Sequence, residues 1–415
     1  MQLKTILNRV QKHSSFVYEE ARFVEGAVPA LEIDLRPRAN SRATCSGCGR
    51  RGPTYDRLAS RRFQFVPLWG LHVFFIYAMR RVDCKRCGVR VEAVPWAEGK
   101  SPLTTAYAWF LAGWARRLSW QETAHAFRTS WDAVFRSVRL AVTWGLAHRD
   151  LEAIEAIGID EISWRRGPRF LTVVYQIDAH CRRLLWIGPD RRVETLEAFF
   201  AAFGERARRL RYVCSDMWRP YLAVIARCAS QAVHVLDRYH LVAKLNKALD
   251  EVRAQEARRM HREGYDPLLK HSRWVLLKNP EHLSDKQSDK LADLLQYNLQ
   301  TMRAYLLKEE LRLLWEYVHP AQAAQFLERW CTKTMRSRIE PLKRIARTCR
   351  LHRPLILNWF RARGTISAAA VEGLNNKLKL TLRKAYGYRF LKIVEIACYH
   401  TLGRLPEPEF AHRFF

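Results

Sequence analysis

Residues 154–237 alternate strand-like and helix-like segments in an order that few folds accommodate. Three strand-like runs follow one another closely, AIGID, RFLTVVYQID and RRLLWIG, and a helix-like segment then leads to the strand-like RYVCSD. A second helix-like segment, PYLAVIARCA, precedes the last strand-like run, AVHVLD. Three strands in close succession favour a meander, and the strand–helix–strand–helix–strand continuation favours parallel pairing through crossover helices. The order therefore predicts one mixed sheet. It is the pattern of an RNase H-like α/β core, although periodicity leaves another mixed sheet open.

Four of the ten cysteines form two C-x-x-C pairs, Cys45 with Cys48 and Cys84 with Cys87. Two such tight turns, brought together, supply the four thiolates of a tetrahedral zinc site. The interval between the pairs exceeds the ~15–20 residues usual in a compact zinc ribbon. A hairpin built from the β-rich segment between the pairs would span it. A redox dithiol and four unrelated cysteines are the alternatives, but the pattern predicts one structural zinc ion.

Helical periodicity runs through residues 101–150. The stretch SWQE is a capping box, in which the Ser and Glu side chains each satisfy an orphan backbone donor, and it starts a short helix. After a turn, Ser130 can cap a following helix, where valines recur on one side and Arg136 and Arg139 lie on the other. Two helices joined by a tight turn, the second with a basic outer face, are similar to a helix-turn-helix. We expect these arginines to contact DNA, with an ordinary helical packing unit as the alternative.

The charge of the chain points to a polyanionic partner. It carries 71 Lys and Arg against 41 Asp and Glu, a net charge of +30. Such an excess attracts DNA or RNA, and an anionic membrane surface is the rival. No apolar run reaches the roughly 18 residues of a membrane span, and the N-terminal stretch MQLKTILNRVQKHSS is too polar for a signal peptide. We therefore expect a cytoplasmic, nucleoid-associated protein without a membrane partner.

Three acids stand on separate predicted elements. Asp160 ends the strand-like AIGID, Asp216 ends RYVCSD, and Glu372 lies in the helix-like SAAAVEGLNNKLK. Carboxylates that converge at a sheet edge can hold Mg²⁺ (or Mn²⁺), which prefers oxygen ligands. Two such ions stabilise the attacking and the leaving oxygen of an in-line displacement at phosphorus. Each acid alone is better explained as a strand-end or solvated carboxylate, but the set of three predicts a two-metal site.

The helix that carries Glu372 has a polar stripe suited to phosphate. Its members recur at helical spacing, and they are Glu372, Asn375, Asn376, Lys379 and Arg383. Apolar residues form the neighbouring stripe, so the polar groups would share one face. Trp218, which follows Asp216 closely, could stack on an unpaired base, with core packing as the alternative.

The segments GIDEIS, SDMWRPY, HVLDRYH and VEGLNNKLKLTLRKAYGYR closely resemble the transposases of the ISL3 insertion-sequence family, and the resemblance covers nearly the whole chain. It implies an N-terminal zinc-binding module, a helix-turn-helix and an RNase H-like catalytic core with a DDE triad. Residue by residue, Asp160, Asp216 and Glu372 would form that triad. The long interval between Asp216 and Glu372 implies a large helical insertion.

Other residues compete for places in this site. The stretch DRYH, which ends at His240, resembles the C/DxxH signature of related transposases; His240 would contact the scissile phosphate or order the site, or else pack as a helix-start histidine. Glu161 adjoins Asp160, but adjacent side chains on a strand point to opposite faces, so one of the two would face the metals. Asp178 is either a reserve ligand or a strand-end turn residue.

We thus expect a multidomain α+β protein. Its predicted regions are a zinc-binding β module (1–100), a helix-turn-helix (101–150), the first part of an RNase H-like core (151–244), an all-α insertion (245–362), and the last core helix with a tail (363–415). The expected function is transposition: binding the terminal inverted repeats of an insertion sequence, cleaving its ends and joining the 3′-OH to target DNA. Pairing two ends requires a homodimer or a higher oligomer. A non-catalytic DNA-binding regulator and a structure-selective nuclease are the alternative functions.

Overall fold

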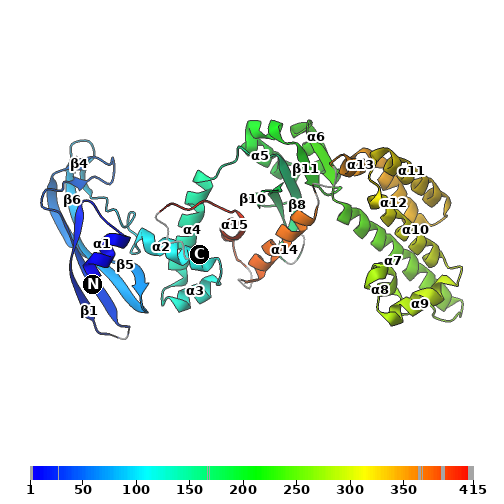
Figure 1. The fold of residues 1–415 in the computed structure, drawn as a ribbon, viewed down its shortest axis with the longest axis horizontal. Helices are drawn as coiled ribbons and strands as arrows, with labels where there is room; N and C mark the ends of the chain where they lie inside the picture. Colours follow the sequence, from blue (N-terminus) through cyan, green and yellow to red (C-terminus); the bar gives the residue numbers. More distant parts are fainter. Residues whose placement is uncertain are drawn as a thin grey trace. The chain divides into compact units, whose positions relative to one another are not determined.

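The structure is a computed structural model, and the chain divides into two compact units, Met1–Arg149 with Thr381–Phe415 and Asp150–Leu380. Figure 1 traces the helices and strands along the chain. The residues that the structure describes are 3–26, 28–165, 167, 169–362, 366, 368–384 and 388–409.

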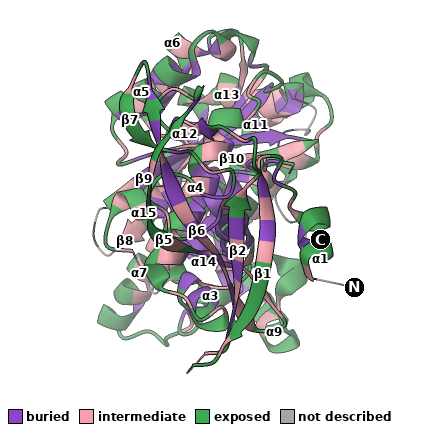
Figure 2. Ribbon diagram, turned by 90° about the vertical axis from the view of Figure 1, so that its left-hand side faces the viewer, coloured by how far each residue is buried: buried purple, intermediate pink, exposed green. Residues whose placement is uncertain are grey.

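A five-stranded sheet forms the larger part of the N-terminal unit. Its strands are β1 (Phe16–Val24), β2 (Ala30–Pro37), β6 (Leu71–Cys84) and β5 (Thr54–Leu68) in order across the sheet, with β7 (Gly88–Val91) paired to the end of β6. Only β2 and β6 pair in parallel. A short helix, α1 (Leu3–Val10), precedes the sheet, and β3 (Ala43–Thr44) and β4 (Arg51–Gly52) form a small separate ladder. Alternate residues of β2 and β6 are buried, as expected for strands with one face on a core, and Figure 2 marks these buried stretches in purple.

Three helices follow the sheet: α2 (Thr105–Ala115), α3 (Trp120–Ala126) and α4 (Trp131–His148). The predicted caps are present, because the Ser119 side chain accepts from the Glu122 amide and the Ser130 side chain accepts from the Ala133 amide. The C-terminal segment returns to this unit. Its helix α15 (Leu391–Leu402) packs against α4, and the Leu405 side chain lies so close to Gly145 that a Cβ would not fit there.

The second unit is built on another five-stranded sheet, of order β10-β9-β8-β11-β12. The strands are β8 (Ala156–Arg165), β9 (Arg169–Asp178), β10 (Cys181–Gly188), β11 (Tyr212–Ser215) and β12 (Val233–Leu236). The helices α5 (Val193–Phe203) and α6 (Arg219–Cys228) make the crossovers, with a 3₁₀ turn (Gly204–Arg209) after α5. The first three strands are antiparallel neighbours, and β8, β11 and β12 run parallel. The predicted mixed sheet and its order of elements are confirmed.

Alternation along β8 assigns its two faces to different helices. Ile157 and Ile159 pack in one core with the apolar residues of α5 and α6. Gly158 points the other way, toward Val371 on α14 (Ala368–Lys384), and a Cβ at this position would clash with the valine side chain. The absence of a side chain at Gly158 thus lets α14 approach the sheet closely. Asp160 shares the face of Gly158, because side chains two apart on a strand point the same way.

The described residues between β12 and α14 form helices joined by short turns. They are α7 (Arg238–Arg262), α8 (Arg273–Leu277), α9 (Asp285–Leu295), α10 (Gln300–Arg312), α11 (Pro320–Arg336), α12 (Glu340–Leu351) and α13 (Arg353–Arg361), with 3₁₀ turns at Pro280–His282 and Leu313–Glu316. They bury one continuous apolar cluster, which Met217 and Leu236 of the sheet region join. The mixed α+β character is therefore confirmed. Helix α7 begins directly after Asp237, so the expected boundary between residues 244 and 245 falls inside it.

Candidate functional site: acids at the ends of parallel strands

Three acids lie at one edge of three neighbouring parallel strands. Asp216 and Asp237 directly follow β11 and β12, whereas Asp160 lies inside β8, which continues to Arg165 in its pairing with β9 and so does not end at Asp160 as predicted. Cys214 on β11 pairs with Gly158 on β8, and Ser215 pairs with Leu236 on β12. Continuing each strand to its next acid brings Asp160, Asp216 and Asp237 to the same edge of the sheet. Carboxyl ends of parallel strands are where α/β sheets place their ligands. The geometry thus unites two of the predicted acids and adds Asp237.

Asp160 is held from two sides. Its Oδ1 accepts the Glu161 amide at 2.7 Å, and its Oδ2 accepts the Asn375 side-chain amide at 2.5 Å. The Tyr175 hydroxyl donates to Asn375 Oδ1 at 2.9 Å, so α14 is tied to both β8 and β9. Burial raises the pKa of Asp160, and the Asp216 charge adds to this, whereas the Glu161 amide, His240 and Asn375 oppose it. Taking a carboxylate out of water favours its protonated form unless a cation compensates.

Glu372 projects from α14 and is exposed. Burial raises the pKa of Asp237, and the charges of Asp160 and Glu372 raise it further. Glu372 precedes Asn375 by three residues on α14, the helix whose Asn375 bonds Asp160. His240 lies one helical turn into α7, with its Nε2 3.6 Å from Asp237 Oδ2, and its charge lowers the pKa values of Asp237 and Asp160. Asp237 itself caps α7 by accepting the Tyr239 amide at 2.8 Å.

Glu161 belongs to the opposite face of β8, as predicted from strand alternation. Its Oε2 is 3.3 Å from Arg191 Nε, and the Arg191 guanidinium lies 4.7 Å from the centre of the Trp218 ring. Burial and the Asp216 charge raise the pKa of Glu161 to about 7. Trp218 also packs edge-on against Tyr221, with ring centres 4.5 Å apart. The packing alternative for Trp218 is therefore the one that this geometry favours.

Hard oxygen donors of this kind suit Mg²⁺ or Mn²⁺. The pKa values of Asp160 and Asp237 are raised first by burial and then by neighbouring carboxylates, and a divalent cation would supply the positive charge that offsets both effects. In the described part of the chain, however, the carboxylate oxygens do not all come within 4.8 Å of one another. Asp160 Oδ2 is also occupied by Asn375. The donor set fits the metal chemically, and closing around an ion requires side-chain movement.

Asp178 takes no part in this cluster. Strand β9 runs antiparallel to β8, and Gln176 pairs with Ile157 at the start of β8. Asp178 therefore ends its strand at the edge of the sheet opposite Asp160, where its Oδ2 accepts the Gln176 side-chain amide at 2.7 Å. Asp178 is therefore a strand-end residue and not a reserve metal ligand, because β9 runs antiparallel to β8 and ends at the opposite edge of the sheet.

The polar stripe of α14 is divided between two environments. Asn375 is buried, and its amide is engaged by Asp160 and Tyr175, so it is not available to DNA while these bonds hold. This differs from the predicted phosphate contact, because Asn375 lies on the side of α14 that meets the sheet. Asn376, Lys379 and Arg383 are exposed, as a nucleic-acid contact requires.

Four cysteines gather in the N-terminal unit. Their Sγ atoms all lie within 4.8 Å of one another, and Cys48 and Cys84 Sγ are 3.6 Å apart. A tetrahedral Zn–S₄ site with bonds of about 2.3 Å has S···S edges of about 3.8 Å, so the cluster has the right size for zinc. The backbone N–H groups of Arg86 and Cys87 lower the pKa of Cys84 to about 7, which favours the thiolate that a metal needs.

The β5–β6 hairpin brings the two C-x-x-C turns together, as the sequence predicted for the long interval. Cys45 and Cys48 lie in the turn between β3 and β4, whereas Cys84 ends β6. A glycine with positive φ follows each pair, Gly49 at 70° and Gly88 at 68°. The two turns therefore share one backbone geometry, which glycine adopts without strain.

The exposed side of α4 carries both predicted arginines. Val134 and Val138 are fully buried beneath them. Arg136 pairs with Asp132 of its own helix at 2.8 Å, and Arg139 lies 5.7 Å from the Phe135 ring centre. Both side chains are exposed, so the predicted division of the helix into an apolar and a basic face is confirmed.

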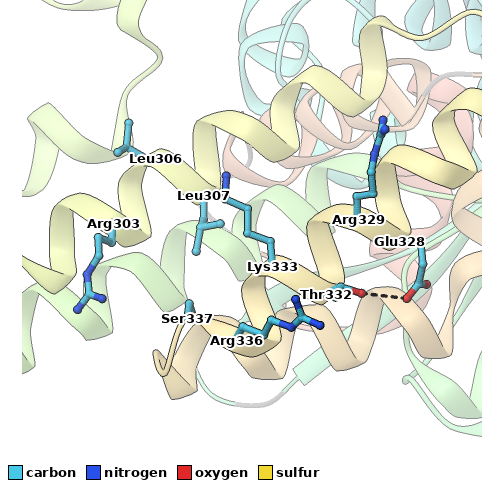
Figure 3. A pocket seen from close by; sticks show the side chains of 9 residues that line it. All are labelled: Arg303, Leu306, Leu307, Glu328, Arg329, Thr332, Lys333, Arg336 and Ser337. Carbon is cyan, nitrogen blue, oxygen red and sulfur yellow. Dashed lines mark hydrogen bonds between the residues drawn. The ribbon is translucent and has the colours of Figure 1, made fainter.

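A separate hollow of about 620 Å³ lies between α10 and α11 (Figure 3). Arg303, Arg329, Lys333 and Arg336 surround a floor that includes Leu306 and Leu307. None of the strand-end acids lines it. Lys333 is paired with Glu310 at 2.8 Å, whereas the three arginines form no ion pair within the described residues. The hollow is thus a basic surface of the helical segment and not part of the acid site.

Sequence reasoning missed three residues that organise the acid site: Asp237 as an acid, Tyr175 and Arg191. The end of AVHVLD was a usable signal for Asp237, because it is the fourth strand-like run of this region to stop on an aspartate. Nothing in the sequence marks Tyr175 or Arg191, whose roles depend on partners from distant segments.

Comparison with known proteins identifies the family of the chain. The model of the transposase family DDE_Tnp_ISL3 matches residues 157–397, which include Asp160, Asp216, Asp237 and Glu372. This chain belongs to the ISL3 family of transposases. The transposase for insertion sequence element IS1001 of Bordetella parapertussis is 32% identical over 384 residues, covering 90% of this chain and 93% of that protein. The transposase for IS1557 of Mycobacterium tuberculosis is 32% identical over 382 residues, covering 86% of this chain and 84% of that protein.

Among solved structures, the Drosophila P element transposase strand transfer complex aligns with 75% of this ISL3 transposase and 94% of that chain. The TM-score is 0.39 and the identity 10%, a likeness too distant to support an inference. Within the described residues of this family member, no helix is both long enough and apolar enough to cross a bilayer.

Proposed function

We propose that this ISL3 transposase cleaves the ends of its insertion sequence and joins them to target DNA, with Asp160, Asp216 and Glu372 as the catalytic acids. The observation that carries the proposal is the convergence of acids from β8, β11 and β12 beside α14, within a family of transposases. The strand order and the helices on both sheet faces are those expected of an RNase H-like core. Such a cluster in a strongly basic chain is suited to bind cations, and bound cations would let it approach phosphates.

The chain's own residues would prepare this site for phosphoryl transfer. Asp160, Asp216 and Glu372 would hold two Mg²⁺ or Mn²⁺ ions, which when bound stabilise the attacking and leaving oxygens of an in-line displacement. The hydrogen bond from Asn375 would hold the Asp160 carboxylate in a fixed orientation until the metal ions bind. His240, beside Asp237, is placed to donate a hydrogen bond to a phosphate oxygen.

The chemistry requires two successive displacements. In the first, water attacks phosphorus at the end of the element and the bond to the 3′-oxygen breaks, which leaves a free 3′-OH. In the second, this 3′-OH attacks a target phosphodiester and displaces the target's 3′-oxygen. Each step exchanges one P–O bond for another, so no covalent enzyme intermediate is needed. Lys379, Arg383 and Asn376, exposed on α14, would hold the DNA backbone.

The other parts of the chain would bind DNA and align it. The four cysteines would hold one structural zinc ion, and α3 and α4 would form a helix-turn-helix with Arg136 and Arg139 toward the terminal inverted repeat. The basic hollow between α10 and α11 would add DNA or subunit contacts. Because two ends must be paired, the active form would be a dimer or a higher oligomer.

Strand transfer on duplex DNA that carries one end of the element, with Mg²⁺ or Mn²⁺ present, tests the assignment. Asp216→Asn should abolish both cleavage and joining, because an amide neither carries the charge nor binds the metal comparably. The matched control is Asp178→Asn, at the opposite edge of the same sheet, which should retain activity. Full activity of Asp216→Asn would refute the proposed chemistry.

Products distinguish the alternative functions. Cleaved ends without target-joined strands would indicate a structure-selective nuclease. Binding without any cleavage by the wild-type chain would indicate a DNA-binding regulator.

A further inference from the structure

The tip of the β5–β6 hairpin has an unusual residue for its geometry. Leu68 pairs directly with Leu71, which leaves Trp69 and Gly70 as a two-residue turn. Both have positive φ, 47° for Trp69 and 81° for Gly70. A turn of this kind favours Asn, Asp or Gly at its first position, because a bulky side chain is strained in the left-handed region. A tryptophan at this position therefore destabilises the turn relative to Asn, Asp or Gly.

The Trp69 side chain is also 91% exposed. A single exposed apolar residue is ordinary on a protein surface. Here, however, the exposed indole also sits on a strained backbone, and neither feature stabilises the folded chain. Strain of this kind persists at sites where function requires it. The combination points to a contact with a partner outside the chain.

The position of the hairpin indicates which kind of partner Trp69 contacts. Val66 on β5 packs against the same apolar cluster as Phe127, which ends α3. Across the hairpin, burial and the charge of Arg128 lower the pKa of His72, and the Phe127 backbone opposes them. These contacts from both strands put the turn at Trp69 beside the turn that joins α3 to α4.

An arginine lies near the hairpin, and a second one is exposed further along α4. Arg128, in the α3–α4 turn, is exposed and forms no ion pair within the part of the chain that the structure describes. Arg139 on α4 is exposed as well, and its nearest described partner is an aromatic ring rather than an acid. An exposed apolar ring near an unpaired guanidinium group complements a DNA groove, where sugars lie between rows of phosphates.

We propose that the β5–β6 hairpin is a second DNA-contacting element of the N-terminal unit, in which Trp69 enters a groove beside the segment bound by α3 and α4. The inference rests on the proposed function. Trp69 supplies apolar contact with sugars and base edges, as wedge residues do in the minor groove. Arg128 supplies a phosphate contact between the hairpin tip and α4.

The salt dependence of binding separates the two contacts. Each neutralised phosphate contributes about one unit to the slope of log K against log salt, whereas an apolar contact contributes none. The full chain is titrated with duplex DNA carrying one end of the element, between 50 and 200 mM salt. Trp69→Asn should lose about fivefold or more in affinity at every salt concentration with an unchanged slope. Trp69→Phe should retain most of the affinity, and Arg128→Ala should lower the slope by about one.

Stability serves as the internal control. Asn suits the first position of this turn, so Trp69→Asn should melt at the same temperature as the wild type or higher, which excludes misfolding as the cause of weaker binding. If the wild type binds this DNA and Trp69→Asn binds it equally well, the hairpin contact is refuted and the proposed function stands. If the substitution changes the sedimentation of the free chain instead of its DNA affinity, the tip contacts a second copy, and the inference is overturned. If the wild type binds no DNA, the proposed function fails first and this inference with it.

Discussion

The Asn375 side-chain amide donates a hydrogen bond to Asp160 Oδ2 from 215 residues further along the chain. Because the Tyr175 hydroxyl donates to the same amide, Asn375 connects α14 to two strands at once. The bond holds one oxygen of Asp160 in a fixed direction and keeps α14, with Glu372, against the sheet edge. Positioning by a residue of this kind is what a catalytic constellation needs from its surroundings.

Removal of that bond should cost both stability and activity. Asn375→Ala removes the hydrogen bonds that Asn375 makes with the Tyr175 hydroxyl and Asp160 Oδ2 inside the protein, and we expect a loss of about 1–3 kcal/mol in the free energy of unfolding, measured by denaturant titration. Strand transfer at a temperature where the variant stays folded should also fall. The neighbouring Asn376 is exposed, and Asn376→Ala should change stability by no more than about 0.5 kcal/mol. Equal effects of the two substitutions would contradict the role given to Asn375.

Close packing between Gly158 and Val371 is testable with a double-mutant cycle. A methyl group at position 158 would clash with the valine, so Gly158→Ala should destabilise the second unit by about 1–3 kcal/mol. The same substitution should cost less in a Val371→Ala background, where the obstructing atoms are gone. Gly113→Ala is the control: it lies in α2 with open space around its missing Cβ and should stabilise the chain slightly. Additive effects of the two substitutions would show that α14 does not rest on Gly158.

Metal analysis of the purified chain should find about one zinc ion per chain. Cys84→Ser should lose the metal and lower the melting temperature of the N-terminal unit, because the two C-x-x-C turns would no longer be joined. Cys181→Ser, outside the cluster, should keep the zinc. A folded wild-type chain free of zinc, or full zinc content in Cys84→Ser, would refute the metal site.

Lowering the pH should reduce the stability of the N-terminal unit, because His13 is buried there. Burial beside Tyr18 and Trp96 lowers the pKa of His13 to about 4, whereas in the unfolded chain it is about 6.5. Between these values the unfolded state binds a proton that the folded state excludes, so this part of the stability is present above pH 6.5 and is lost as the pH falls. At pH 5 the loss is about 2 kcal/mol.

Unfolding measured at pH 7.5 and pH 5 checks the sign and size of this effect. His13→Phe should reduce the difference between the two pH values by that amount. His125→Gln, at an exposed position of the same unit, should leave it as in the wild type. An unchanged difference in His13→Phe would mean that another group carries the acid sensitivity.

Much of the fold could be predicted from local patterns in the sequence. The caps at Ser119 and Ser130 are formed by residues within a few positions, so the helix starts in residues 101–150 could be predicted. The order of strands and helices over 154–237 followed from runs of apolar residues and limited the sheet to few topologies. The four cysteines could be grouped because metal ligation imposes a spacing within each pair that is visible in the sequence.

The sequence by itself determined the order of the elements, the faces of α4, the two cysteine pairs and the strand end before Asp216, since each depends on neighbours along the chain. Only the tertiary structure decided that Asp237 joins Asp160 and Asp216 while Asp178 lies at the other edge, because strand direction is a property of pairing. It also decided that Asn375 faces Asp160. That contact joins segments 215 residues apart, and no local spacing or propensity encodes which distant partner a buried amide will find.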